Sequence, residues 1–438
     1  MGLWIDDWEF HSFKIFIYEY LINLIEYNII IFIFMENKTN IDDLKKEIKR
    51  LAEMNKKFKT DFKLSDTRLS FYCLNKGEEV FEILNEFSFP KLENLDLRYN
   101  QIKNITKLTL TKLNKLQILN LAENELENIE PLSKCKLENL TELLLFKNKI
   151  NSIDILSECS FNNLKILDLS NNSLGSLNIE TFKPFNKLEK LSLSENNLQN
   201  NDIFSLEESE KVFENLKILY LSRNKITKLS SFKCPNLREL YLIGNQISDI
   251  DSLAQSKFNE LKILWLSENE IKNVDFISKI EMNKLKELYL SNNSINNIEI
   301  FKKCNLSNLE ILYLSDNQID DINVFEGPKL NSLKTLNLNN NKIQNIDIFN
   351  KCSLNKLENL HLNNNKINNI DNLLLSTIGQ QLKILNLRFN QISDIKVLNQ
   401  SKLDNLKILD IKNNKIDKKK NQDIISNIKK LSKFKFLI

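Results

Sequence analysis

The chain has 438 residues, a formal net charge of +3, six glycines and five prolines. So few glycines argue against glycine-lined phosphate-binding folds, and so few prolines argue against proline-rich disorder. The near balance of charge argues against an overall field that would attract nucleic acid or an anionic membrane. The two histidines, His11 and His361, make most zinc sites and histidine-based catalysis implausible. Six cysteines are too sparse for a disulfide scaffold.

The first 34 residues are rich in aromatic residues and isoleucine, unlike the rest of the chain, and three explanations are open. A secretory signal peptide fits poorly, because the start is acidic rather than basic and lacks a small-residue cleavage site. A membrane anchor over residues 13–35 has the required length, but Glu19 and Glu26 interrupt it and each is costly in lipid. We favour the third explanation, that translation starts at Met35 and that residues 1–34 are an over-extended gene model.

A helical N-terminal cap is predicted over residues 35–91. An amphipathic helix is expected at residues 40–58, where apolar side chains recur at helical spacing among lysines and glutamates: Ile41, Leu44, Ile48, Leu51 and Phe58. The stretch 69–89 follows no clean pattern. The first unit of a stacked array must shield the open end of its core, so we expect both stretches to form a cap. A coiled coil is the weaker alternative, because Asn55 occupies an apolar slot and only about two heptads exist.

Residues 92–416 repeat the pattern L-x-x-L-x-L-x-x-N-x-[IL] in fourteen copies. Examples are LYLSRNKI at 219–226, LYLSDNQI at 312–319 and LHLNNNKI at 360–367. Ten of the thirteen steps between successive asparagines are 24 residues long, and the others are 28, 21 and 25. These frame asparagines are Asn100, Asn124, Asn148, Asn172, Asn196, Asn224, Asn245, Asn269, Asn293, Asn317, Asn341, Asn365, Asn390 and Asn414.

Each position of the pattern has a physical reason. The L-x-L core alternates, as a short strand with one buried face does. The asparagine follows where the chain turns out of the strand, and its side chain can bond backbone groups that would otherwise be unpaired. The second half of each unit is too short for a long helix and predicts a short helix, a 3-10 turn or extended chain. One unit cannot bury its own leucines, so the units must stack to form a continuous core.

This pattern resembles that of the leucine-rich-repeat family, and the resemblance covers about residues 92–416. It implies an α/β fold: a curved, horseshoe-shaped solenoid with a parallel β-sheet on the concave face. Short helices, 3-10 turns or loops are implied on the convex face. The cysteine-rich flanking caps of secreted members of the family are missing from this chain.

Two regions depart from the regular pattern. In the 28-residue step, Ser205 and Glu208 fit a helix capping box, which predicts a longer helix on the outer side over residues 205–213. The next step has only 21 residues, and we expect a local distortion of the solenoid there.

The last segment, residues 417–438, is predicted to be a basic C-terminal cap. A short helix is indicated by Ile424, Ile425, Ile428 and Leu431. Seven lysines accompany it: Lys418, Lys419, Lys420, Lys429, Lys430, Lys433 and Lys435. They could bind nucleic acid or acidic lipid or serve as an import signal. We favour the simpler interpretation, that they keep the cap solvated.

Recognisable catalytic, cofactor and metal motifs are missing from the sequence. It contains neither phosphate-cradling glycine motif and no C-x-x-C pair. A catalytic role for His361, at an outward strand position, is disfavoured. We therefore expect no enzyme activity, no cofactor and no metal site.

Four cysteines share a slot thirteen residues before a frame asparagine: Cys135, Cys159, Cys304 and Cys352. Ser256 and Ser401 occupy the same slot, so a small side chain that can be buried fits there. Cys135 and Cys159 are one repeat apart, about 5 Å at strand spacing, which makes a disulfide geometrically conceivable. The other two are about 10 Å apart, which is too far. The pattern favours reduced thiols and an intracellular location.

The concave face is where we expect function, because the framework residues are used up in packing. Five consecutive repeats carry an aromatic residue between the two strand leucines. This aromatic strip consists of Tyr220, Tyr241, Trp265, Tyr289 and Tyr313. Two residues earlier, on the same face, isoleucine alternates with glutamate in a flanking row of Ile218, Glu239, Ile263, Glu287 and Ile311. Aromatic residues also suit strands by themselves, but the run is contiguous and has the composition of a binding hot spot.

We therefore expect a non-catalytic module that binds a protein or peptide, with basic residues facing the glutamates. Nucleic acid is disfavoured, because it would require lysine and arginine beside the rings. We expect a monomer in the cytoplasm or nucleus. One alternative is a regulatory subunit of an enzyme, since the pattern also resembles the leucine-rich-repeat regulatory subunit of protein phosphatase 1, whose repeats are shorter. The other is a membrane-anchored receptor held by residues 13–35.

Overall fold

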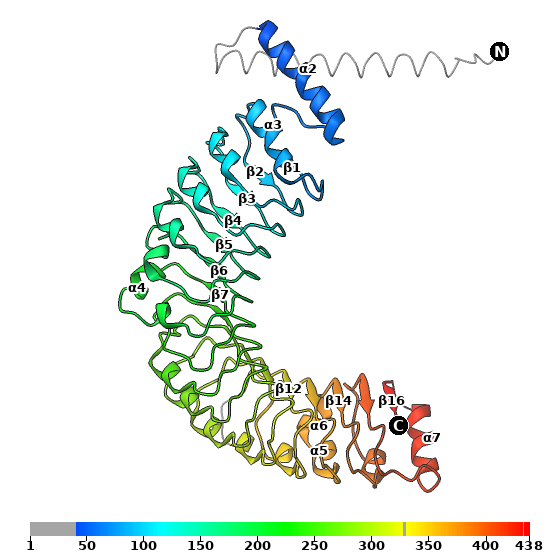
Figure 1. Cartoon of the computed structure of the whole chain (residues 1–438). Helices are drawn as coiled ribbons and strands as arrows, with labels where there is room; N and C mark the ends of the chain where they lie inside the picture. The colour runs from blue at the N-terminus through cyan, green and yellow to red at the C-terminus, as the bar shows by residue number, and fades with distance from the viewer. Residues whose placement is uncertain (1–40, 327–329, 432) are drawn as a thin grey trace, which may run out of the picture.

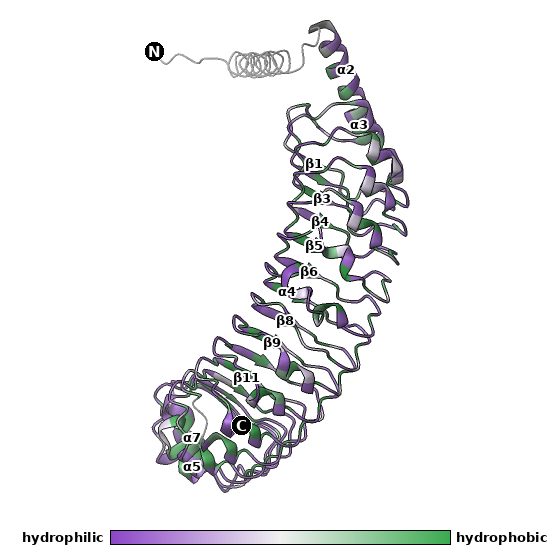
Figure 2. Ribbon diagram, turned by 90° about the vertical axis from the view of Figure 1, so that its left-hand side faces the viewer, coloured by the Kyte–Doolittle hydropathy of each residue, from purple (hydrophilic) through white to green (hydrophobic). Residues whose placement is uncertain are grey.

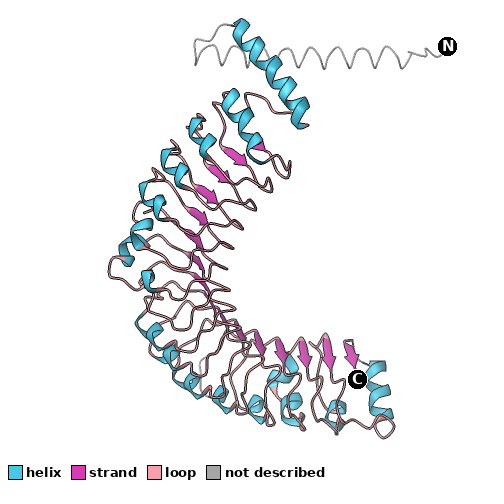
Figure 3. Cartoon of the chain, viewed as in Figure 1, coloured by secondary structure: helices cyan, strands magenta, loops and turns pink. Residues whose placement is uncertain are grey.

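The computed structural model describes residues 41–326, 330–431 and 433–438, and the hydrophobic extension at residues 1–34 lies outside them. The described chain forms an open arc, and its sixteen parallel strands follow one another in sequence order in one sheet (Figure 1). The strands line the inner side of the arc, and the short helices between them lie on its outer side (Figure 3). The expected α/β horseshoe is therefore confirmed.

The strands are short and pair in register. Each has three residues, and in β1 to β15 the middle residue is a buried leucine that points into the core. Its two neighbours face the concave side, because successive side chains of a strand point to opposite faces. The strands are Arg68–Ser70 (β1), Asn94–Asp96 (β2), Ile118–Asn120 (β3), Glu142–Leu144 (β4), Ile166–Asp168 (β5), Lys190–Ser192 (β6), Ile218–Tyr220 (β7), Glu239–Tyr241 (β8), Ile263–Trp265 (β9), Glu287–Tyr289 (β10), Ile311–Tyr313 (β11), Thr335–Asn337 (β12), Asn359–His361 (β13), Ile384–Asn386 (β14), Ile408–Asp410 (β15) and Lys435–Leu437 (β16).

The segments that return the chain to the next strand are mostly single turns of 3-10 helix, as their length predicts. The 3-10 turns are Gly77–Glu79 (η1), Thr106–Leu110 (η2), Glu130–Lys134 (η3), Asp154–Glu158 (η4), Ile179–Phe182 (η5), Asp202–Phe204 (η6), Asp251–Gln255 (η7), Asp275–Ser278 (η8), Glu299–Lys303 (η9), Asn323–Glu326 (η10), Asp347–Asn350 (η11) and Lys396–Asn399 (η12). The α-helices are Ile41–Phe58 (α2), Val80–Glu86 (α3), Ser209–Val212 (α4), Asp371–Leu375 (α5), Thr377–Gln381 (α6) and Gln422–Leu431 (α7).

A left-handed backbone turn ends every regular strand segment. The residue directly before each frame asparagine has a φ between 52° and 57°, except Gly244 with 70°. This position is occupied by residues as different as Lys147, Asn292 and Phe389. A positive φ is unfavourable for most side chains, so the hydrogen bonds of the turn must hold it.

The frame asparagines supply those hydrogen bonds, and each one ties its repeat to the preceding one. The Nδ2 of Asn317 donates to the carbonyl oxygens of Leu290, Leu314 and Ser315 at 2.9, 3.2 and 3.1 Å. Its Oδ1 accepts from the backbone nitrogen of Ile295 at 3.0 Å. This confirms the predicted turn role. At the start of the ladder, the buried Oδ1 of Asn100 has no hydrogen-bond partner among the described residues.

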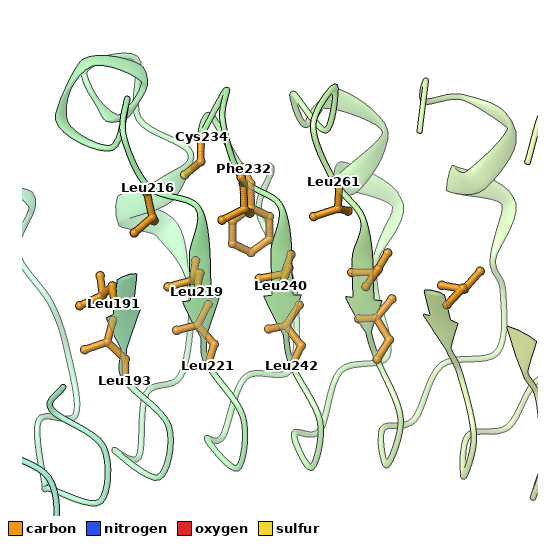
Figure 4. Close-up of a cluster of buried hydrophobic side chains, with 14 of the residues drawn as sticks. Leu191, Leu193, Leu216, Leu219, Leu221, Phe232, Cys234, Leu240, Leu242 and Leu261 are labelled. Atoms are coloured by element: carbon orange, nitrogen blue, oxygen red, sulfur yellow. The ribbon is translucent and has the colours of Figure 1, made fainter. Parts of the chain in front are cut away.

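The core is a continuous column between the sheet and the convex turns. Strand leucines stack from repeat to repeat, and Phe232 packs above them (Figure 4). A phenylalanine spine runs along the convex side of this column. The ring centroid of Phe204 lies 4.9 Å from that of Phe213 and 5.9 Å from that of Phe232, which in turn is 6.0 Å from that of Phe258. The side view shows hydrophobic segments inside each coil and hydrophilic turns at its edges (Figure 2).

The helix predicted in the 28-residue step is shorter than expected, and the predicted capping box is wrong. Helix α4 has four residues, and Glu208, which precedes it, makes no side-chain capping bond. The Ser205 hydroxyl instead donates to the carbonyl oxygen of Asp202 at 2.8 Å. The prediction failed because Ser205 ends the separate 3-10 turn η6 in a helical conformation and therefore does not start a helix.

The expected distortion is confined to the convex side. The sheet passes through both irregular repeats in unbroken register, with Lys190 opposite Ile218 and Ile218 opposite Glu239. The 21-residue repeat has no helix between β7 and β8. An ion pair of 2.7 Å between Lys257 and Glu210 joins the segments on either side of it. The extra residues of one repeat therefore compensate for those missing from the next.

The helix predicted at residues 40–58 is confirmed as α2, and Phe58 at its end is buried in the core. The Asn55 side chain accepts from the backbone nitrogen of Phe62 at 3.1 Å and donates to its carbonyl oxygen at 2.8 Å. An asparagine therefore fits this apolar slot, because it fixes the turn that follows the helix. Strand β1 adds an atypical repeat before residue 92.

The predicted C-terminal helix is confirmed as α7. Ile424, Ile425 and Ile428 pack against the end of the core. Beyond the helix the chain adds strand β16, which pairs with β15 and which the repeat pattern did not predict. The boundaries that we draw at residues 34, 91 and 416 remain predictions.

All six cysteines are free thiols. Cys135 Sγ donates to the carbonyl oxygen of Pro131 at 3.3 Å, and Ser401 Oγ donates in the same way to that of Val397 at 2.7 Å. The slot thus holds a small side chain that donates to the preceding turn in these repeats, whereas Ser256 in the same slot accepts from the backbone nitrogen of Phe232 at 2.9 Å. Burial raises the pKa of Cys135 to about 11 and that of Cys159 to about 12, so neither is a reactive thiolate near neutral pH.

Candidate binding surface on the concave face

The structure brings all five members of the aromatic strip together, on the consecutive strands β7 to β11. The ring centroids of Tyr220 and Tyr241 are 4.5 Å apart, with their planes 11° from parallel. Those of Trp265 and Tyr289 are 4.4 Å apart at 21°. Between these two stacked pairs, Tyr241 and Trp265 are separated by 6.1 Å at 41°. Tyr313 completes the strip edge-on, 5.1 Å from Tyr289.

The stacking decides which parts of the rings a partner can reach. Parallel strands about 4.8 Å apart hold the rings at the distance at which aromatic side chains pack on one another. The neighbours therefore cover the faces of the inner rings, and the strip presents ring edges and hydroxyl groups to the concavity. Nucleic-acid bases and sugars bind aromatic residues through ring faces, so this arrangement suits them poorly.

The glutamates of the flanking row bond to the strip on their own strands. The hydroxyl of Tyr241 donates to Oε2 of Glu239 at 2.9 Å, and that of Tyr289 donates to Oε2 of Glu287 at 2.7 Å. In the part of the chain that the structure describes, neither carboxylate forms an ion pair. Glu310, just outside the row, forms ion pairs with two lysines. Two carboxylates beside the strip thus have no ion pair among the described residues.

The tyrosine hydroxyls of the strip are held in their protonated form. Burial, the hydrogen bond to Glu239 and the negative charge of that residue raise the pKa of Tyr241 above its ordinary value. The same three causes, with Glu287 as the partner, raise the pKa of Tyr289. Burial, followed by the charge of Glu239, also raises the pKa of Tyr220. These hydroxyls therefore remain hydrogen-bond donors throughout the physiological pH range.

One polar atom of the strip is unpaired. The Nε1 of Trp265 is buried and has no hydrogen-bond partner among the residues that the structure describes. Leaving a buried donor unpaired costs about 1–3 kcal/mol. The packing of the strip therefore outweighs an uncompensated desolvation cost at Trp265.

The two ends of the strip differ in charge and polarity. On the N-terminal side, the Nζ of Lys190 in β6 lies 5.2 Å from the ring centroid of Tyr220. On the C-terminal side, Asn337, His361 and Asn386 occupy the same positions on β12 to β14. Burial lowers the pKa of His361 below its ordinary value, so the imidazole is neutral at pH 7. The strip is thus bounded by a cation at one end and by neutral polar groups at the other.

The structure also reveals an exposed aromatic pair that the sequence pattern did not single out. The rings of Tyr72 and Tyr99 meet edge to face at 5.5 Å near the N-terminal end of the solenoid. The Arg98 guanidinium lies 5.1 Å from the ring centroid of Tyr72. The signal available in the sequence was Tyr99 itself, which precedes a frame asparagine at a position where polar residues predominate.

Within residues 41–326, 330–431 and 433–438, no group of three or more His, Cys, Asp or Glu side chains is arranged to hold a metal ion. None of the helices in the same ranges combines the length and the apolar character that crossing a bilayer requires.

Comparison with known families identifies the repeat along much of the chain. Models of leucine-rich repeats match residues 90–150, 163–185, 214–255, 235–279, 283–327 and 380–395. A comparison with curated proteins finds no significant match.

Solved structures with the same architecture come from several different organisms. A leucine-rich-repeat protein of Leptospira interrogans is 27% identical with a TM-score of 0.66, over 83% of this chain and 86% of that one. An internalin of Listeria monocytogenes is 26% identical with a TM-score of 0.55, over 70% of this chain and 83% of that one. The Drosophila Toll–Spatzle complex matches at 23% identity and a TM-score of 0.63, over 77% of this chain and 45% of that chain, which shows the fold alone.

The 24-residue period, the parallel sheet in sequence order and the matching family models agree with one another. The chain belongs to the leucine-rich-repeat family.

Proposed function

We propose that this protein is a non-catalytic interaction module that binds a protein or peptide on its concave face. The observation that carries the proposal is the aromatic strip, five contiguous rings beside two glutamates that form no ion pair within the described residues. Tyrosine and tryptophan are enriched at binding hot spots. The strands hold the strip in place before binding, so docking loses little conformational entropy.

We propose that the partner presents lysine or arginine to the strip. Glu239 and Glu287 are half-buried carboxylates without an ion pair in the described chain, whereas Glu310 nearby is paired twice. A partner cation would neutralise a charge that the fold leaves uncompensated, and charge-assisted hydrogen bonds are the stronger ones. A nucleic acid would meet the opposite electrostatics, since its phosphates repel carboxylates.

The remaining parts of the proposal follow from the composition and the thiols. We propose a reducing compartment such as the cytoplasm, because all six cysteines are free thiols. We also propose that the protein is a monomer. We propose that residues 35–91 and 417–438 act as caps of the solenoid. If the partner is an enzyme, the module would act as a regulatory subunit, which copurifying phosphatase activity would reveal. A membrane-anchored receptor would instead resist extraction from membranes by carbonate.

The test is a paired capture from native lysate with the full-length chain as bait. The strip variant carries Tyr241→Ala, Trp265→Ala and Tyr289→Ala. A matched control carries Asn337→Ala, His361→Ala and Asn386→Ala, which truncates the same positions on the next strands. All three baits are checked by circular dichroism for a retained fold.

We expect one or more proteins to be recovered by the wild-type and control baits and lost from the strip variant. Replacing Trp265 alone should weaken binding by about 2 kcal/mol or more if it is a hot spot. Equal recovery by all three folded baits would contradict the proposal and would show that the rings serve only the strand packing.

A further inference from the structure

The flanking row repeats its chemistry every two strands. Glu239 in β8 and Glu287 in β10 are separated by Ile263 in β9, which pairs in register with both. Because neighbouring strands are about 4.8 Å apart, the two carboxylates are spaced by about 9.6 Å along the solenoid axis. Ile218 and Ile311 continue the alternation on either side. A ligand that lies along the axis thus meets acidic, apolar and acidic positions in turn.

This spacing matches one peptide conformation better than the others. A polyproline II helix has three residues per turn and rises about 3.1 Å per residue, so residues i and i+3 lie on the same side about 9.3 Å apart. In an extended strand, residues on the same face recur about every 6.7 Å, which does not fit the glutamates. An α-helix brings i and i+7 together at about 10.5 Å, but its diameter of about 10–12 Å holds its backbone far from the strip.

The aromatic strip is the second feature of the concave face that suits a polyproline II helix. It lies about 6.7 Å from the flanking row, two residues further along each strand. Polyproline II segments dock against surfaces lined with aromatic residues, and their carbonyl oxygens are free to accept hydrogen bonds. The hydroxyls of Tyr220 and Tyr313, whose strands carry isoleucine in the flanking row, are the donors that face these carbonyl oxygens, because Tyr241 and Tyr289 already donate their hydroxyl protons to Glu239 and Glu287.

We infer that the concave face takes a polyproline II segment whose two basic residues are separated by two others, one basic residue for each of Glu239 and Glu287. This inference rests on the proposed function and names the partner motif of the same site. The apolar residues between the basic pair contact Ile263 and the ring edges.

The flanking row also limits the motif at one end. Lys190 in β6 occupies the equivalent position two strands before Glu239, and Thr335 in β12 the one two strands beyond Glu287. A third basic residue at the next turn of the peptide would meet Lys190 and be repelled. An acidic residue there, three positions beyond the basic pair, would be attracted instead.

The experiment measures fluorescence anisotropy with the full-length chain and labelled proline-rich peptides of equal length and composition. Their two arginines are separated by one, two or three residues, and one further helix-forming peptide carries them seven positions apart. We expect the peptide with two intervening residues to bind most tightly. Glu239→Gln and Glu287→Gln should each weaken its binding about five-fold, because each removes a charge but keeps an acceptor for the tyrosine hydroxyl.

The matched control is Glu142→Gln, at the same strand position in β4 and outside the strip, and it should leave binding unchanged. Two further peptides carry an aspartate three positions from the arginine pair, one on its N-terminal side and one on its C-terminal side. Only one of them should bind more tightly than the parent peptide, and Lys190→Gln should abolish that gain.

Binding that is independent of the arginine spacing, tighter binding of the helical peptide, or no binding of any peptide would overturn the inference. The proposed function is judged separately, by partner capture that depends on the strip. Strip-dependent capture together with one of these results would refute the motif and leave the function standing.

Discussion

The hydrogen-bond ladder of frame asparagines predicts a large effect from a very small change. Asn317→Asp keeps the size and shape of the side chain but replaces Nδ2, which donates to three carbonyl oxygens, with an oxygen atom. At about 0.5–1.5 kcal/mol for each of the three bonds, the variant should lose about 1.5–4.5 kcal/mol of stability. The bond that Oδ1 accepts from Ile295 is retained, so the loss comes from the missing donor together with the negative charge of the ionised carboxyl.

The pH dependence of the variant gives a second, independent readout. The new carboxyl is buried among carbonyl oxygens, so its pKa in the folded state should lie above the value of about 3.9 in the unfolded chain. The unfolded state then releases its proton first as the pH rises, which favours unfolding. We expect the stability deficit of Asn317→Asp to be larger at pH 7 than at pH 4.

The assay is chemical denaturation combined with hydrogen exchange, because a long repeat array need not unfold in a single step. Asn292→Asp is the matched control, since Asn292 is exposed and next to a frame asparagine. A deficit below about 1 kcal/mol at both pH values, equal to that of the control, would refute the role that we assign to the ladder.

Three further predictions follow from local geometry. NMR titration should give His361 a pKa below 6.5, because burial lowers the pKa of its imidazole. The neutral imidazole then contributes to stability above pH 6.5, and this contribution is lost as the pH falls through the pKa of the folded state. An ordinary pKa would contradict the burial. At pH 8 a thiol reagent should modify exposed Cys73 and spare Cys135, whose pKa burial raises to about 11, and equal rates would contradict the closed core. Gly379→Ala should destabilise the fold by about 1–3 kcal/mol, because the new Cβ would clash with the carbonyl oxygen of Leu373, and unchanged thermal stability would refute that clash.

The fold could be predicted from the sequence because each repeat has the same residue types at the same buried and turn positions. Fourteen copies of the pattern fix the strand leucines and the turn asparagines, and the structure places them as expected. The repeat pattern did not predict strands β1 and β16, because each departs from it at one position. Leu74 stands where the unit of β1 would have its frame asparagine, and in β16 Phe436 takes the place of the middle strand leucine.

Side-chain pairing was harder to foresee. The sequence shows which residues occupy the concave face, but not that the hydroxyls of Tyr241 and Tyr289 bond their own strands' glutamates. These bonds depend on rotamers, which the strand period does not specify. The capping box at Ser205 failed for a related reason, because Ser205 ends the turn η6 with helical dihedral angles, φ −99° and ψ −13°, whereas a capping serine is typically extended.

Site-specific photocrosslinking in cells tests the central claim, binding on the concave strip, most directly. A photoreactive phenylalanine analogue is placed either at Tyr313, the end ring of the strip, or at Leu375, an exposed apolar residue of α5 on the convex side. We predict a discrete crosslinked product from position 313 and none from position 375. A product from position 375 alone, or none from position 313 in a folded protein, would contradict a partner on the concave face.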